Sequence, residues 1–247
     1  MRGRTVILPI RSDVAVVIPA LNEADNVGPV VAELRAAAID VVVVVDNGST
    51  DDTASVARAA GAIVVSEPRR GYGWACAAGT AEALRRDAGV IVYIDADRSS
   101  LASEIDRVLE PLLDGRADLV LGSRTRGTSD PGAMGVHQRF GNWLTAAIMR
   151  RLYGVTVTDL GPYRAIDARM LAALKLTEMT FGWPTEMMVK AARRQARIVE
   201  VPVSWHHRHA GESKVSGTIK GTILAGWYLL SVTFKHAFGA RPAPWHG

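Results

Sequence analysis

The stretch VIVYIDADRSS at residues 90–100 places two carboxylates, Asp95 and Asp97, directly after an apolar run with the composition of a β-strand. Two carboxylates one residue apart at the end of a buried strand repel each other unless a cation or a positively charged ligand shares their field. Because the pair offers only oxygen donors, it favours a hard ion such as Mg²⁺ or Mn²⁺, which takes its other ligands from water and phosphate. A structural interpretation also exists, in which Asp95 caps the next helix and Asp97 faces solvent.

Similar apolar runs recur along the first half of the chain. They are VAVVIPA (14–20), VVVVVDN (41–47), AIVVSE (62–67), VIVYIDA (90–96) and ADLVLGS (117–123). Continuous apolar runs indicate strands buried on both faces, so the sequence predicts a single α/β domain with a mostly parallel, Rossmann-like sheet and helices on both faces. Ligands of such sheets bind beyond the carboxyl ends of the strands. We therefore expect the polar residues that follow these strands to converge on one edge: Asn22, Glu23, Asp46, Asn47, Asp95, Asp97 and Arg124.

The composition limits the class of protein and its partners. The chain has 247 residues and a formal net charge of +4, which suggests an anionic partner such as a nucleotide, a lipid phosphate, an anionic membrane or a nucleic acid. No stripe of aromatic and basic residues supports nucleic acid. The single cysteine, Cys76, excludes an internal disulfide and fits the cytoplasm. The longest apolar run near the C-terminus, TILAGWYLLSVTF, has 13 residues, where a membrane-spanning helix needs about 20.

The motifs narrow the class further. The chain lacks the G-x-G-x-x-G loop of a dinucleotide-binding domain and the lysine loop of a nucleotide triphosphatase. It carries, in order, VVIPALNE, VVDNGSTDDT, RRGYGWACAAG, DADRSS and LGSR. In these motifs the chain resembles the family-2 glycosyltransferases with the GT-A fold. Further on, TDLGPYRAI, GWPTEMMVKA, VEVPVSW and RHAGESK resemble the polyprenyl-phosphate (dolichol-phosphate) hexose synthases, so that the resemblance runs from about Val14 to Lys214.

The resemblance implies a site for a nucleotide-sugar donor. Pro19, Leu21 and Glu23 would border the nucleoside, and Asp46 would accept a hydrogen bond from the base. The family usually has D-D-G-S where this chain has DNGS, so Asn47 keeps a hydrogen-bond acceptor but loses a charge. The alternative is that Asn47 only shapes the turn.

The resemblance also assigns roles to the carboxylate pair. Asp97 would bind the metal ion directly, Asp95 would contact the ribose or reach the ion through water, and Ala96 between them would line the donor site. Ser99 stands where relatives often have a Gln or His that completes the coordination, and it would be a weaker ligand. The ion would bridge the diphosphate and stabilise the charge on the departing nucleoside diphosphate.

Four basic residues are candidates for binding anions. By resemblance, Arg124 and Arg139 would grip the phosphate of the acceptor. Arg208 and Lys214 would close a flexible loop over the donor diphosphate. A guanidinium can contact two phosphate oxygens at once, whereas Lys contributes a point charge. The alternative for Arg124 and Arg208 is an ordinary solvated arginine.

The need for a general base depends on the acceptor. A phosphate acceptor is already ionised at neutral pH, whereas a hydroxyl acceptor must lose a proton. Relatives that use hydroxyl acceptors have an acidic residue in the region of WPTEM, which makes Glu186 the leading candidate base and Asp159 of TDLGP the second. Alternatively, Glu186 orients an arginine of the acceptor site.

The chain divides into four predicted segments: an N-terminal extension (1–12), a GT-A glycosyltransferase domain (13–215), a C-terminal amphipathic helix (216–238) and a tail (239–247). One face of that helix is apolar and carries Ile219, Ile223, Trp227, Leu230 and Phe234. Such a helix packs on the protein body or lies in a membrane interface. The expected location is the cytoplasm, with peripheral contact to the inner face of the membrane in the second case.

The sequence thus predicts an inverting, metal-dependent glycosyltransferase that moves a hexose from a UDP- or GDP-sugar to a polyprenyl phosphate, with Mg²⁺ or Mn²⁺ as cofactor. One alternative is a glycosyltransferase acting on a soluble small molecule, either a phosphorylated metabolite or a hydroxyl. Another is a nucleotide-sugar binding protein without catalysis. The resemblance leaves the base and the sugar of the donor open.

Overall fold

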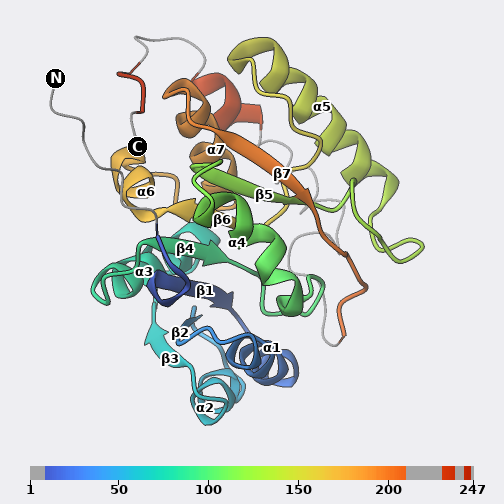
Figure 1. Ribbon diagram of the computed structural model, residues 1–247. Helices are drawn as coiled ribbons and strands as arrows, with labels where there is room; N and C mark the ends of the chain where they lie inside the picture. The colour runs from blue at the N-terminus through green and yellow to red at the C-terminus, as the bar shows by residue number, and fades with distance from the viewer. Residues whose placement is uncertain (1–8, 210–229, 237–241, 246–247) are drawn as a thin grey trace, which may run out of the picture.

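A seven-stranded sheet forms the centre of the computed structural model (Figure 1), which describes residues 9–209, 230–236 and 242–245. The strands are β1 (Val14–Ala20), β2 (Val41–Asp46), β3 (Ile63–Ser66), β4 (Val90–Tyr93), β5 (Leu119–Ser123), β6 (Arg164–Asp167) and β7 (Ile198–Pro202). Their order across the sheet is β3-β2-β1-β4-β6-β5-β7. Neighbouring strands are parallel except at β6, which runs antiparallel to both β4 and β5. The predicted α/β fold with a mostly parallel sheet is confirmed.

The strands that the sequence predicts all form, because each is an apolar run long enough to cross the core. Strands β4 and β5 are buried along their whole length, as expected for strands covered on both faces. The sequence does not predict β6 and β7 as strands. Strand β6 has four residues with a charge at each end, and β7 is only partly buried at the edge of the sheet, so neither has an uninterrupted apolar run.

Helices cover both faces of the sheet. They are α1 (Ala24–Ala36), α2 (Thr53–Ala59), α3 (Tyr72–Leu84), α4 (Ile105–Leu113), α5 (Val136–Tyr153), α6 (Ala168–Leu174) and α7 (Trp183–Arg193), with short 3-10 turns at Arg11–Asp13 and Ala102–Glu104. Successive strand residues point to opposite faces. In β1, Ile18 therefore packs with α1 and α4 in one core, and Val17 packs with α3, α6 and α7 in the other.

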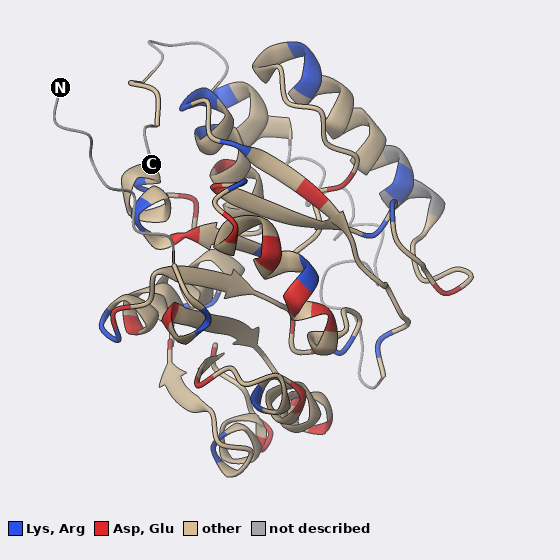
Figure 2. Ribbon diagram, in the orientation of Figure 1, with Lys and Arg blue, Asp and Glu red and all other residues tan. Residues whose placement is uncertain are grey.

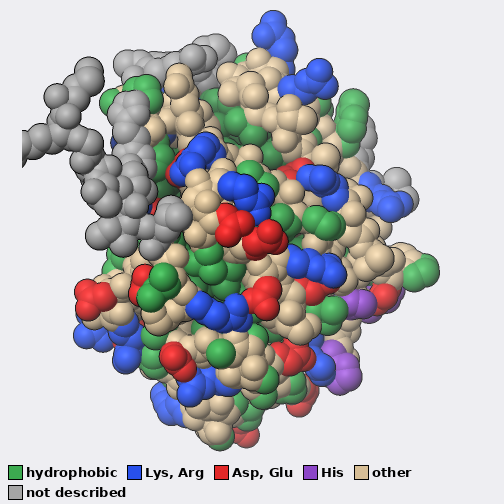
Figure 3. Space-filling model, in the orientation of Figure 1, with side chains coloured by type: hydrophobic (Ala, Val, Ile, Leu, Met, Phe, Trp, Pro, Cys, Tyr) green, Lys and Arg blue, Asp and Glu red, His purple; other side chains and the backbone are tan. Residues whose placement is uncertain are grey.

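The charged residues lie mainly on the helices and loops. Strands β1, β4 and β5 contain no Lys, Arg, Asp or Glu, and Figure 2 draws them as tan ribbons. On the face shown in Figure 3, basic and acidic side chains are interspersed. The net charge of +4 is therefore not gathered into a single basic patch on that face.

Most of the predicted C-terminal helix at 216–238 lies outside the described residues. Of the described part, 230–236, residues 230–235 are helical. Within the described segments, no helix is both long and apolar enough to cross a bilayer.

The carboxyl ends of the parallel strands meet at one edge of the sheet. Ala20 at the end of β1 pairs with Asp46 at the end of β2, and Ser123 at the end of β5 pairs with Pro202 of β7. Because β6 is antiparallel, its first residue, Arg164, lies at this same edge, beside Tyr93 and Leu121. The loops that follow these strands surround the site described next.

Candidate active site

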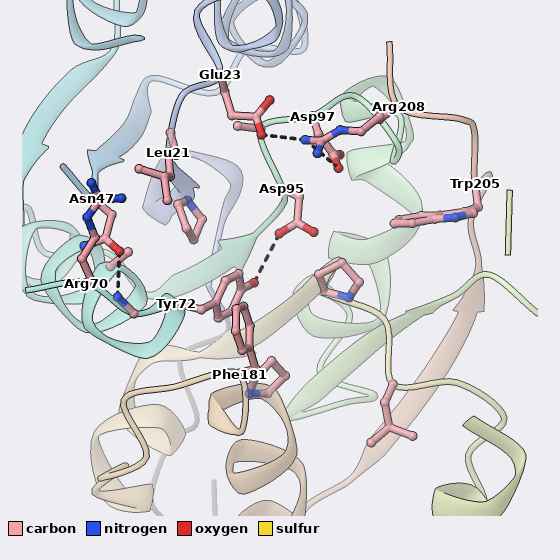
Figure 4. Close-up of a pocket in the computed structure, with 18 of the residues that line it drawn as sticks. Leu21, Glu23, Asn47, Arg70, Tyr72, Asp95, Asp97, Phe181, Trp205 and Arg208 are labelled. Carbon is pink, nitrogen blue, oxygen red and sulfur yellow. Dashed lines mark hydrogen bonds and ion pairs between the residues drawn. The ribbon is translucent and has the colours of Figure 1, made fainter. Parts of the chain in front are cut away.

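A cavity of about 680 Å³ opens beyond the carboxyl ends of β1, β2, β4 and β5 (Figure 4). Its lining consists of Pro19, Ala20, Leu21, Glu23, Asn47, Arg70, Gly71, Tyr72, Ala75, Asp95, Ala96, Asp97, Arg124, Leu160, Pro162, Phe181, Pro184, Trp205 and Arg208. Of the residues that the sequence singles out, nine lie in this lining: Pro19, Leu21, Glu23, Asn47, Asp95, Ala96, Asp97, Arg124 and Arg208. The structure thus brings together residues that are far apart in the sequence.

The two carboxylates after β4 both face the cavity. Burial, together with the charge of Asp97, raises the pKa of Asp95 to about 7. The Tyr72 hydroxyl donates a long hydrogen bond of 3.4 Å to Oδ1 of Asp95. A raised pKa means that the folded protein leaves the negative charge of Asp95 incompletely compensated. The pair can therefore hold a cation.

Ser99 is buried beside the pair and does not line the cavity. Its amide and its hydroxyl both donate to Oδ1 of Asp97, at 3.0 and 2.6 Å. These bonds fix the Asp97 side chain. In this arrangement Ser99 orients Asp97, the predicted metal ligand.

Arg208 reaches into the cavity from the segment after β7 and lies between two carboxylates, as Figure 4 shows. Its Nη2 donates to Oε1 of Glu23 at 2.6 Å and lies 3.5 Å from Oδ2 of Asp97. Arg208 therefore supplies positive charge next to the carboxylate pair. Lys214, its predicted partner in closing over the donor, lies outside the described residues.

Asn47 holds the loop that leads into α3. Its Nδ2 donates to the carbonyl oxygens of Glu67 and Arg69 at 2.8 and 2.7 Å, and its Oδ1 accepts from the Gly71 amide at 3.0 Å. An aspartate here would place a negative charge against two carbonyl oxygens, so the amide suits this loop conformation better than a carboxylate. Asp46 lies next to the cavity but not in its lining, and its Oδ1 accepts a 2.9 Å bond from the Ser49 amide.

The glycines before and inside α3 allow a close approach of protein backbone. A Cβ on Gly71 would lie 2.6 Å from the carbonyl oxygen of Met179, and a Cβ on Gly73 would lie 2.4 Å from Cα of Met179. Larger side chains would push this segment away from α3. The two glycines therefore help to place neighbouring Phe181 in the cavity wall.

Arg124 is clamped on one side by Asp159. The Nε of Arg124 donates to Oδ2 at 2.7 Å, and its Nη2 donates to Oδ1 at 2.7 Å. Burial by itself would lower the pKa of Arg124, but the hydrogen bond to Asp159 and the negative charges of Asp159 and Asp95 together raise it overall. Asp159 itself is fully buried and does not line the cavity. Both oxygens of Asp159 already accept protein hydrogen bonds, an arrangement that does not favour the predicted role of general base.

Glu186 also lies outside the cavity lining, and its carboxylate is buried in α7. It accepts from the amides of Thr177 and Glu178, each at 2.8 Å, and pairs with Lys190 at 2.8 Å. Burial would raise the pKa of Glu186, but Lys190 and these amides lower it overall. A carboxylate in this setting is a poor base. Among the described residues that pair with Glu186, none is an arginine of the cavity lining, so this setting favours neither predicted role.

Arg139 is exposed on the first half of α5 and is not part of the cavity lining. The structure therefore does not bring it to Arg124, with which the sequence pairs it.

Several lining residues have no role in the sequence-based prediction: Arg70, Tyr72, Leu160, Pro162, Phe181, Pro184 and Trp205. Most of them lie within or beside motifs quoted above. Apart from Arg70, their side-chain types are equally typical of a core. The cavity becomes visible only once the loops after β4, β6 and β7 are placed.

An α/β sheet whose carboxyl edge carries paired carboxylates facing arginines across a cavity is the architecture of a GT-A glycosyltransferase. The family model of glycosyl transferase family 2 matches residues 15–174, and the chain belongs to this family. The predicted resemblance and fold are confirmed.

Two relatives and one solved structure illustrate the likeness. An uncharacterized glycosyltransferase of Mycobacterium tuberculosis is 39% identical over 216 residues, which cover 86% of this chain and 94% of the relative. Undecaprenyl-phosphate mannosyltransferase of Micrococcus luteus is 33% identical over 223 residues, covering 84% and 89%. Glucosyl-3-phosphoglycerate synthase of M. tuberculosis, solved with Mn²⁺, UDP-glucose and phosphoglyceric acid, has a TM-score of 0.72 at 23% identity, covering 91% of this chain and 79% of that one. At this identity the last likeness establishes the fold alone.

Proposed function

We propose that this protein is an inverting, metal-dependent hexosyltransferase that uses a nucleoside-diphosphate sugar as donor and a polyprenyl phosphate as acceptor. Family membership supports the reaction class. One observation carries the choice of acceptor: Glu186 and Asp159, the carboxylates that the sequence offers as bases, are both held by protein donors away from the cavity lining. An acceptor that brings its own negative charge needs no such base.

On the donor side, Asp95 and Asp97 fit a hard divalent ion. Both offer carboxylate oxygens, and the raised pKa of Asp95 reflects a local lack of positive charge. No group of three or more His, Cys, Asp or Glu suited to a metal occurs in the described part of the chain, so substrate phosphate and water would complete the coordination. Bound there, Mg²⁺ or Mn²⁺ would stabilise the charge that develops on the departing diphosphate.

Arg208 has two positions in this proposal. In the ligand-free protein it neutralises Glu23 and Asp97. When the nucleotide sugar is bound, the guanidinium of Arg208 contacts its diphosphate. The diphosphate offers this planar hydrogen-bonding group more oxygens than one carboxylate does. Pro19, Leu21 and Asn47 then border the nucleoside.

On the acceptor side, Arg124 binds the phosphate and turns one of its oxygens toward the sugar. This oxygen is already ionised at neutral pH and attacks without losing a proton. The neighbouring wall is apolar, with Leu160, Pro162, Phe181 and Pro184 in the lining, and this composition suits the first isoprene unit of a lipid acceptor. The relation to an undecaprenyl-phosphate mannosyltransferase supports the same class of acceptor. We further propose that the enzyme works in the cytoplasm, with peripheral contact to the membrane that holds such a lipid.

A phosphorylated soluble metabolite is the second candidate acceptor. Arg124 recognises the phosphate group and does not by itself distinguish what the phosphate is attached to. The cavity volume of about 680 Å³ would also accommodate a small phosphorylated acid.

A panel of donors and acceptors tests the proposal. UDP- and GDP-linked glucose and mannose would be incubated with Mn²⁺ and either farnesyl phosphate, 3-phosphoglycerate or farnesol, and products would be identified by mass spectrometry. We expect a hexosyl phosphodiester with farnesyl phosphate for one donor. Product with 3-phosphoglycerate alone would establish the soluble acceptor, and product with farnesol would contradict a phosphate acceptor.

A further inference from the structure

We propose that Asp159 is a positioning residue that holds Arg124 in one orientation, so that one guanidinium nitrogen is presented to the cavity for a phosphate oxygen of the acceptor. The inference rests on the proposed function, because it concerns the same acceptor site. It assigns Asp159 a role quite different from that of a base.

The clamp fixes Arg124 at three points. Its backbone amide and its Nε both donate to Oδ2 of Asp159, at 2.8 and 2.7 Å, while Nη2 donates to Oδ1 at 2.7 Å. Two parallel bonds to one carboxylate set the plane of the guanidinium as well as its position. Nη1, on the far side of the fork, makes no hydrogen bond to any residue that the structure describes. Since Arg124 lines the cavity, this nitrogen is the donor left for a ligand.

Other residues hold the clamp in turn. Asn142 of α5 donates from Nδ2 to Oδ1 of Asp159 at 2.7 Å, and Oε1 of Glu200 in β7 accepts from the Asp159 amide at 3.0 Å. The ring of Trp205 packs against the guanidinium of Arg124, with its centroid 4.7 Å from Cζ. The pair is thereby fixed from a helix, a strand and an aromatic ring.

Gly161 allows the loop after Asp159 to come this close. A Cβ at this position would lie 2.7 Å from the carbonyl oxygen of Gly122 and 3.5 Å from both Nε of Arg124 and Oδ2 of Asp159. The local backbone therefore fits the clamp, with no room for a side chain between the loop and β5.

The consequence for binding follows from preorganisation. A free arginine must lose its rotamer freedom when it binds phosphate, whereas Arg124 has already done so in the fold. Without Asp159, Arg124 would regain this rotamer freedom and would have to lose it again on binding phosphate. The carboxylate of Asp159 thus keeps Arg124 oriented for the acceptor.

The chain contains a matched pair for comparison. At the other end of β5, Asp118 accepts from the amide and Nε of Arg197 at 2.7 and 3.1 Å, and from its Nη2 at 2.6 Å. This pair has the same bonding pattern as Asp159 with Arg124, but neither of its members lines the cavity. Asp118→Asn therefore removes an equivalent clamp away from the site.

The experiment compares Asp159→Asn with Asp118→Asn and with Arg124→Ala. Calorimetry would measure binding of farnesyl phosphate, and separately of UDP or GDP with Mn²⁺. The tryptophan emission spectrum of each variant would be recorded, and the spectrum of the same variant with Trp205→Phe would be subtracted. The difference reports the surroundings of the Trp205 ring, against which Arg124 packs. We expect Asp159→Asn to weaken farnesyl phosphate binding by about ten- to hundredfold, to leave nucleotide binding within about twofold, and to shift the Trp205 emission as Arg124→Ala does. Asp118→Asn should change none of these.

The outcomes separate the inference from the proposed function. Wild-type emission and wild-type farnesyl phosphate affinity in Asp159→Asn would overturn the positioning role, and so would an equal loss in Asp118→Asn. If the wild-type protein binds no farnesyl phosphate, the proposed acceptor is wrong, and the Trp205 emission of Asp159→Asn alone then supports or overturns the positioning role. Should Asp159→Asn fail to fold, Asn142→Ala takes its place. We then expect the affinity for farnesyl phosphate to fall by about three- to fivefold, and wild-type affinity would overturn the positioning role.

Discussion

The two sides of the cavity hold their charges in different ways. On the proposed donor side, Arg208 touches Glu23 closely but lies 3.5 Å from Asp97, and the pKa of Asp95 is raised to about 7 by burial and by Asp97. On the proposed acceptor side, Arg124 and Asp159 form a two-bond clamp at 2.7 Å. The donor side therefore has negative charge ready for an incoming cation, whereas the acceptor side is already paired and oriented. This difference suits a metal-bound donor and an anionic acceptor.

The largest effect is expected at Asp97. Asp97→Ala should lower transfer activity by at least about a hundredfold, because it removes the direct ligand of the metal. The melting temperature of the ligand-free protein should change little, since the substitution also relieves repulsion with Asp95. Activity with Mn²⁺ and the thermal transition would be measured together. Asp97→Asn, which keeps the size of the side chain, serves as the control. Full activity of the wild-type protein in excess chelator would rule out a metal-dependent mechanism.

The second effect is a pH dependence of metal binding. The pKa of Asp95 is raised to about 7, so a proton must leave before a cation can bind when the pH lies below 7. We expect the Kd for Mn²⁺ to fall by about tenfold between pH 6 and pH 8, since the ionised fraction of Asp95 rises by that factor. Calorimetric titration at several pH values would measure this change. An affinity that stays constant over the range would show that Asp95 takes no part in binding.

A smaller effect is expected at Arg208, where a substitution should increase the affinity for Mn²⁺. Arg208→Ala should tighten binding of Mn²⁺ alone by about two- to fivefold, because the competing positive charge beside Asp97 is gone. The same substitution should weaken binding of the nucleoside diphosphate, which loses its guanidinium partner. Weaker Mn²⁺ binding in this variant would mean that Arg208 does not compete for the carboxylates. Arg139→Ala, which changes an exposed arginine outside the lining, is the matched control.

The smallest effect on activity is expected at Glu186. Glu186→Gln should keep turnover with farnesyl phosphate within about twofold, because a phosphate acceptor has no proton to give up. It should lower the free energy of unfolding by about 1–3 kcal/mol, since the amide group would face donors that now meet a carboxylate. Steady-state kinetics and urea unfolding measure the two quantities. A hundredfold loss of turnover in a stably folded variant would restore Glu186 as the base.

The sequence predicts the fold, and part of the cavity lining, for a physical reason. The five apolar runs mark buried strands, and parallel strands bring their carboxyl ends together. Glu23, Asn47, Asp95, Asp97 and Arg124 therefore meet as expected.

The acceptor side is harder to predict, because its geometry depends on β6 and on loops without periodic patterns. Glu186 and Asp159 resemble bases in the sequence, since their residue types suit proton transfer. Only the structure shows that the Glu186 carboxylate is paired with Lys190 and the Asp159 carboxylate with Arg124. The closely packed loop at Gly161, likewise, is not apparent from sequence spacing.

The most direct test of the account is a crossed binding measurement on Arg124→Ala and Asp97→Ala. Calorimetry would give, for each variant, the Kd of farnesyl phosphate and the Kd of the nucleoside diphosphate with Mn²⁺. We predict that Arg124→Ala weakens farnesyl phosphate by at least about tenfold and spares the nucleotide, while Asp97→Ala does the reverse. If farnesyl phosphate binds Arg124→Ala as tightly as wild type, or if both variants lose both ligands equally, the division of the cavity into a metal-bound donor side and a clamped acceptor side is wrong.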